Sequence, residues 1–142
     1  MTAILALLLT IGVGAVAVIH AMWGLGSHWP EANEEALARA VVGDGRRRMP
    51  PPWQCFAVAI GLAAMALWPW YALGRIAEPV VLAGTYTIAG IFVARCIAGY
   101  SVRWRAHFKD EPFATRNRKY YSPYCLLIGI GYIALVAGEL DR

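Results

Sequence analysis

The sequence predicts an all-α integral membrane protein, a bundle of four transmembrane helices. Hydrophobic residues make up 59% of its 142 residues and charged residues only 15%, against roughly 45–50% and about 25% in soluble domains. Four apolar stretches, 3–22, 53–71, 80–99 and 123–138, are each close to the ~20 residues that a helix needs to cross a bilayer. Because lipid offers the backbone no hydrogen-bond partners, each stretch is expected to be helical.

The remainder of the chain leaves no room for a second domain. The connections 23–52, 72–79 and 100–122 are each shorter than the roughly 40 residues that a marginal soluble domain needs. We therefore expect one transmembrane domain, residues 1–142.

The first apolar stretch is expected to stay in the protein as a membrane span. Met1 and Thr2 carry no basic side chain, and the run is longer than the ~7–15 residues of a signal-peptide core. Cleavage near Ala21, which would leave three spans, is the alternative.

The first connection is expected to contain a short amphipathic helix at the membrane interface. Pro30 and the acids after it suit a first helical turn, and Gly43 is a natural stop. The prolines at 50–52 then form an extended lead into the second span. The apolar face of the short helix is Ala36, Leu37, Ala40 and Val41.

The later connections differ in length and character. Residues 72–79 are few, so the second and third spans are expected to form a hairpin. Residues 102–109 alternate apolar and charged side chains, which suits either a strand or an interfacial helix with Trp104 and Phe108 one turn apart. Pro123 is interpreted as a first-turn residue of the fourth helix.

The Lys and Arg residues outside the spans predict the orientation. Ten lie in the first and third connections, against Arg75 in the second and Arg142 at the C-terminus. Since basic short loops stay in the cytoplasm, we expect a multi-pass protein of a bacterial inner membrane with both termini in the periplasm. The net charge of +4 then indicates contact with anionic lipid, not with nucleic acid. The ten residues are Arg39, Arg46, Arg47, Arg48, Arg103, Arg105, Lys109, Arg116, Arg118 and Lys119.

Several polar and aromatic residues fall near one membrane depth, at the cytoplasmic ends of the spans. Polar groups at such positions are costly and often functional, so we expect a ligand pocket there. The alternatives are that Arg95 only extends to the lipid headgroups and that His20 only bonds a nearby carbonyl. The candidate ligand-binding residues are His20, Trp23, Trp53, Arg95, Tyr120, Tyr121 and Ser122.

The residues of redox and metal chemistry are sparse. Cys55, Cys96 and Cys125 lack C-x-x-C spacing, so we expect reduced thiols that pack as small apolar side chains and no metal site. A His/Cys metal or haem site is the alternative. No Asp or Glu lies inside a span, which disfavours a proton-coupled exporter. Catalytic residues and cofactors stay open.

Four segments, 20–26, 50–52, 95–99 and 121–126, resemble one bacterial four-span membrane family, catalogued as domain of unknown function 3995. The most specific parts are the His-x-x-Trp-Gly start at His20 and the Tyr-Ser-Pro-x-Cys-Leu run that contains Ser122 and Pro123. The resemblance covers nearly the whole chain. It implies a four-helix inner-membrane protein with no known activity and no established catalytic residues.

The expected function is binding of a lipid-like or other apolar small molecule at the cytoplasmic side of the bundle. The lipid bilayer is an expected partner in every case. Two alternative functions stay open. One is an accessory subunit of a larger membrane complex, or a homo-oligomer. The other is a membrane enzyme or haem protein that uses His20 and Arg95.

Overall fold

The computed structural model describes residues 1–141, and it is helical with no strand in that range. Four helices in it are long and apolar enough to cross a membrane, so the chain is a multi-pass membrane protein. The four predicted spans are confirmed, and each helix extends slightly beyond them. The long helices are α1 (Thr2–Gly24), α3 (Pro52–Ala72), α4 (Pro79–Tyr100) and α7 (Ser122–Leu140). The short elements are α2 (Glu34–Val41), α5 (Val102–His107), α6 (Phe113–Arg116) and a π-helical turn, η1 (Asn117–Tyr121).

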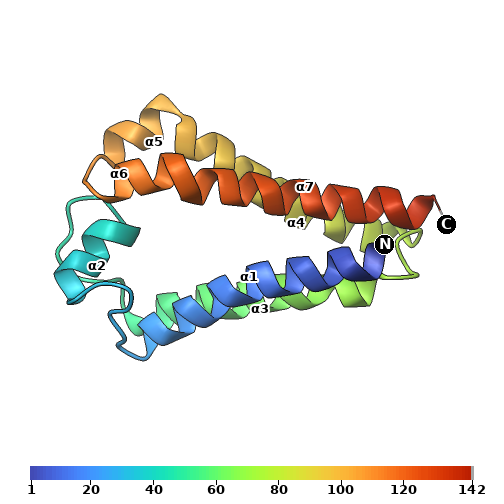
Figure 1. The fold of residues 1–142 in the computed structure, drawn as a ribbon, viewed down its shortest axis with the longest axis horizontal. Coiled ribbons are helices and arrows are strands. Elements are labelled where there is room, and N and C mark those ends of the chain that lie inside the picture. Colours follow the sequence, from blue (N-terminus) through green and yellow to red (C-terminus); the bar gives the residue numbers. More distant parts are fainter. Residues whose placement is uncertain (142) are drawn as a thin grey trace.

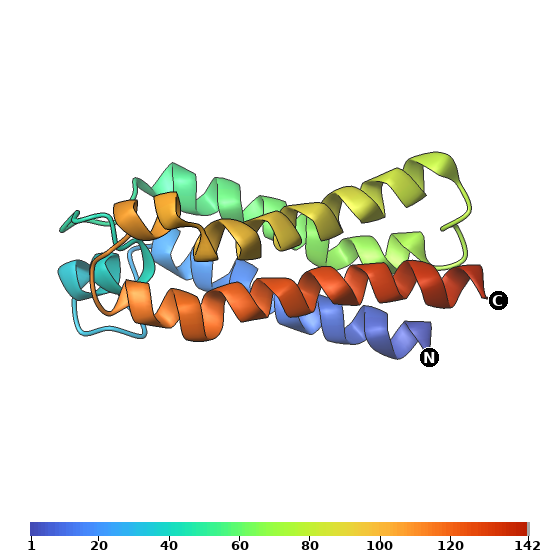
Figure 2. The same cartoon turned by 90° about the horizontal axis from the view of Figure 1, so that it is seen from above.

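The four long helices form two pairs. Helix α1 packs mainly on α3, and α4 packs mainly on α7, whereas the contacts between the pairs are smaller. Figure 1 shows the two pairs meeting where both chain ends lie and diverging toward the end that carries α2, α5 and α6. Figure 2 shows the same short helices grouped at that end. We call it the loop end.

The two pairs are joined in the half of the bundle that lies away from the loop end. Leu9, Val13, Ala66, Phe92 and Tyr132 belong to one buried apolar cluster with members from all four long helices. Tyr132, a member of this cluster, has a hydroxyl group that finds a partner, as lipid requires. The Tyr132 hydroxyl donates to the Met65 carbonyl at 2.6 Å, which ties α7 to α3.

The short helix of the first connection is confirmed, but its start was predicted wrongly. It begins at Glu34, not near Pro30, because the Asn33 side chain caps it by accepting a hydrogen bond from the Ala36 N–H at 2.9 Å. An N-cap of this kind satisfies a free N–H of the first turn. The stop at Gly43 agrees with its positive φ of 73°.

Pro123 lies in the first turn of α7, as predicted. Helix α7 does not start the segment, however, because it continues a helical stretch that begins at Phe113. The π-helical turn η1 lies directly before Ser122 and Pro123. A π turn changes the hydrogen-bond register, and it precedes the position where the proline ring offers no N–H. Residues 102–107 are a helix and not a strand, with the Trp104 and Phe108 rings 4.4 Å apart.

The first and third connections contact each other across the loop end, where the helix pairs diverge. Arg116 forms an ion pair with Glu31 at 2.5 Å, and the Tyr121 hydroxyl donates to the Ala40 carbonyl at 3.1 Å. Phe113 fills the space beside Gly43 where a side chain would otherwise lie. These contacts join the first connection, around α2, to α6 and η1.

Candidate functional site

Arg95 is the one Lys or Arg inside a predicted span, and it is held by neutral partners. It lies in the last turns of α4, where its Nη2 donates to the Asn117 Oδ1 atom at 3.0 Å. The Asn117 amide donates in turn to the Gly99 carbonyl at 3.1 Å, and the Ser122 hydroxyl donates to Asn117 Oδ1 at 3.3 Å. The ion pairs of residues 1–141 give Arg95 no carboxylate partner.

Trp104, from the short helix α5, covers the Arg95 guanidinium. The Arg95 Cζ atom lies 4.5 Å from the centroid of the indole ring, a cation–π contact. Both residues keep a buried N–H without a hydrogen-bond partner among residues 1–141: Arg95 Nη1 and Trp104 Nε1. Buried donors of this kind are rare in folded proteins, so this cluster is incomplete as a purely structural network.

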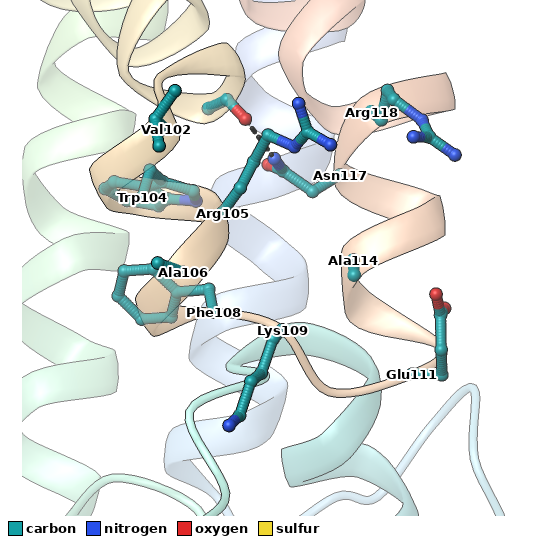
Figure 3. A pocket seen from close by; sticks show the side chains of 11 residues that line it. Val102, Trp104, Arg105, Ala106, Phe108, Lys109, Glu111, Ala114, Asn117 and Arg118 are labelled. Carbon is teal, nitrogen blue, oxygen red and sulfur yellow. Dashed lines mark hydrogen bonds between the residues drawn. The ribbon is translucent and has the colours of Figure 1, made fainter.

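A pocket of about 470 Å³ lies beside this cluster, between α5 and the segment formed by α6 and η1. Gly99, Trp104 and Asn117 belong both to the cluster and to the wall of the pocket. Figure 3 labels Asn117 beside the pocket, and the dashed line marks the hydrogen bond that its amide donates to the Gly99 carbonyl.

The lining of this pocket combines apolar surface with cations. Trp104 and Phe108 contribute apolar surface. Glu111, the acid of the lining, already accepts hydrogen bonds from Thr115. Arg105, Lys109 and Arg118, which we call the rim cations, take part in none of the ion pairs of residues 1–141. The pocket therefore offers positive charge that no described acid neutralises.

A second, smaller hollow of about 270 Å³ lies between the first and third connections. Its lining contains Arg39, Arg46 and Arg47 together with Glu35, Asp110 and Glu111. Here the charges are matched: Arg46 bonds Asp44 at 2.6 Å and lowers the pKa of that carboxyl below its ordinary value. Arg47 lies near Glu35. This hollow has as many acids as arginines in its lining, whereas the first pocket has one acid beside its three rim cations.

The structure does not bring His20 to Arg95. The His20 Nδ1 atom lies 2.8 Å from the Val16 carbonyl of its own helix, and the imidazole contacts the Trp23 ring with centroids 4.8 Å apart. The Trp23 N–H donates to the Trp29 carbonyl at 2.8 Å. None of the described contacts joins this group to Arg95, which belongs to the other helix pair.

The remaining candidate residues lie in different surroundings. Ser122 is buried and belongs to the Arg95 cluster through Asn117. Tyr121 contacts the first connection through the Ala40 carbonyl. Trp53 and Tyr120 are 67% and 64% exposed, positions that suit contact with lipid. Their part in ligand binding stays a prediction.

Sequence reasoning missed two residues of the cluster, Asn117 and Trp104. Asn117 stands among the basic residues Arg116, Arg118 and Lys119 and gives no sign of being buried. Trp104 alternates with exposed arginines, so its pattern indicates only an interfacial residue. Asn117 is buried and begins the π-helical turn η1, and no residue pattern here predicts that turn.

Possible metal ligands are scattered. Residues 1–141 contain no group of three or more His, Cys, Asp or Glu side chains placed to hold one metal ion. Cys55 and Cys96 are buried and Cys125 is half-buried, on α3, α4 and α7.

Comparison with known proteins bears on the family and not on an activity. No curated protein and no solved structure matches the chain. Residues 13–132 match the family described as a protein of unknown function (DUF3995). The match covers most of the chain, including α1 from Val13 onward, both long connections and much of α7. The chain thus belongs to the DUF3995 family.

Proposed function

We propose that this protein binds an amphiphile with an acidic head group in the pocket between α5 and the α6–η1 segment. The proposal includes an orientation in which the loop end faces the cytoplasm of a bacterium, as the ten basic residues of the two connections predict. The observation that carries it is the set of rim cations, Arg105, Lys109 and Arg118, beside an apolar wall.

The position of the pocket suits such a ligand. The pocket begins at Gly99, near the end of α4, so in a bilayer that α4 spans it would lie near the depth where lipid head groups meet the hydrocarbon. Trp104 and Phe108 supply aromatic surface for the upper part of an acyl chain, and aromatic residues favour this interface. Basic pockets beside transmembrane helices on the cytoplasmic side are known to take anionic head groups.

The charge balance selects the sign of the head group. The three rim cations outnumber the single acid of the lining, Glu111, whose carboxylate already bonds Thr115. A zwitterionic head group would bring its own cation close to these side chains. An acidic head group brings only negative charge and is therefore favoured.

The test compares lipid retention by native mass spectrometry after reconstitution in nanodiscs that contain phosphatidylcholine with a small fraction of an anionic lipid, either phosphatidylglycerol or phosphatidic acid. We expect the wild type to retain both anionic lipids over phosphatidylcholine. The triple variant Arg105→Gln/Lys109→Gln/Arg118→Gln should lose this preference by about tenfold or more, since each basic residue near a lipid surface contributes about 1 kcal/mol.

A control with the same change in net charge separates the pocket from general attraction to the membrane. Arg48, Arg103 and Lys119 are exposed basic residues of the same two connections and line neither hollow. The variant Arg48→Gln/Arg103→Gln/Lys119→Gln should keep most of the preference. Equal losses in the two triple variants, or no preference for either anionic lipid in the wild type, would contradict the proposed function.

A further inference from the structure

Two buried N–H groups without acceptors lie at the membrane side of the pocket. They are Arg95 Nη1 and Trp104 Nε1. The Arg95 guanidinium lies over the Trp104 ring, so both donors belong to one small cluster. Its other polar groups bond one another: Arg95 Nη2 and Ser122 Oγ donate to Asn117, and Asn117 donates to Gly99. Arg95 Nη1 and Trp104 Nε1 are the two donors that this network does not bond.

The free donor of Arg95 lies close to the pocket wall. A β-carbon built on Gly99, a residue of that wall, would lie 3.0 Å from Arg95 Nη1. Gly99 has no side chain, so residue 99 places no side-chain atom between Arg95 Nη1 and the pocket. Trp104 belongs to the wall itself.

The charge of the cluster points to the chemistry of the missing partner. Arg95 keeps its positive charge near neutral pH, and it contacts the Asn117 amide and the Trp104 ring, both of them neutral. An unneutralised cation at this depth is costly. An acid group with two free oxygens satisfies two N–H donors and neutralises the charge, and guanidinium groups bind phosphate and carboxylate in this way.

We infer that the acid group of the bound amphiphile binds Arg95 Nη1 and Trp104 Nε1, below the rim cations. This inference rests on the proposed function and adds the ligand class to it. Both donors are buried, so the acid must be at the tip of the head group to reach them. The site therefore selects a terminal acid, a phosphate monoester or a carboxylate, over a phosphate diester that carries a further substituent.

The experiment measures the ratio of phosphatidic acid to phosphatidylglycerol that the wild-type protein retains in nanodiscs, with native mass spectrometry as the readout. Phosphatidic acid ends in a phosphate monoester, whereas the phosphate of phosphatidylglycerol carries glycerol. We expect a ratio of about ten or more, the effect of one charge-assisted hydrogen bond. A ratio near one overturns the inference and leaves the proposed function intact. The absence of a preference for either lipid over phosphatidylcholine instead contradicts the proposed function.

Two variants assign the ratio to the buried donors. Arg95→Gln should bring the ratio toward one. Trp104→Phe removes the indole N–H together with part of the ring system and keeps a smaller aromatic ring, so it should lower the ratio severalfold in a protein that stays folded. This variant decides the matter if Arg95→Gln does not fold. A ratio that persists in Trp104→Phe and in folded Arg95→Gln overturns the assignment.

A competition experiment distinguishes a site for the phosphate group of a lipid from a site for inorganic phosphate. Excess inorganic phosphate is added to the wild-type protein loaded with phosphatidic acid. We expect the lipid to stay bound, because Trp104 and Phe108 hold its apolar part. Displacement of the lipid by phosphate alone would show a site for the free anion and would overturn the assignment to an amphiphile.

Discussion

Replacing Gly99 with valine should lower the free energy of unfolding by about 1–3 kcal/mol or more, the usual cost of forcing extra atoms into a packed site. Gly99 lies in α4 where α7 comes close. A β-carbon on it would overlap the Ser122 hydroxyl and lie 3.1 Å from Asn117 Nδ2. Valine would therefore push α7 away from α4 at the polar cluster. Small residues at such contacts let membrane helices approach closely.

Gly90 provides the matched control in the same helix. A β-carbon on Gly90 would have no neighbour within 4 Å, so Gly90→Val changes helix propensity in the same way without a clash. The measurement is unfolding in mixed micelles, followed by the thermal or denaturant midpoint of helicity. Gly90→Val should unfold near the wild-type midpoint and Gly99→Val well below it. Equal midpoints for the two variants would show that α4 and α7 do not pack as described.

Topology reporters should give an all-or-none result. The structure places the first and third connections at one end and the second connection, with the C-terminal end of α7, at the other. Fusions at Gly45 and Lys109 should therefore agree with each other, and fusions at Gly74 and after the last residue should give the opposite signal. The basic residues predict that the first pair is cytoplasmic.

Paired fusions to alkaline phosphatase and to a fluorescent protein that folds only in the cytoplasm measure this directly. A cytoplasmic signal at Gly74 with a periplasmic signal at Gly45 would reverse the proposed orientation. Different signals at Gly45 and Lys109 would contradict the four-span arrangement itself.

The spans were predictable because their cause is local. A run of apolar residues of bilayer length must be helical wherever it packs, so α1, α3, α4 and α7 follow from composition alone. Helix α2 was also predictable from a local pattern, because its apolar residues are spaced to form one face of a helix. Its first residue was not, because a capping side chain, Asn33, decides the start and Pro30 looks equally suitable in sequence.

The candidate site was predictable only in part. Membrane depth is a single coordinate, and it placed His20 and Arg95 at the same end of the molecule. Membrane depth contains no information on which helices pack together. The sequence therefore did not show that His20 and Arg95 belong to different helix pairs. Arg95 stood out as the only charge within a span, but its partner Asn117 depends on how η1 is wound.

The most direct test of the binding site is photolabelling with an anionic lipid. A phosphatidic acid with a diazirine near the top of its acyl chain is activated in nanodiscs with the wild-type protein, and the labelled peptides are mapped. We predict labels concentrated in peptides containing Val102–His107 and Asn117–Tyr121, the segments beside the pocket, and far fewer there with the phosphatidylcholine analogue. Labels spread over the lipid-facing helices in the same pattern for both lipids would contradict a head-group site between α5 and the α6–η1 segment.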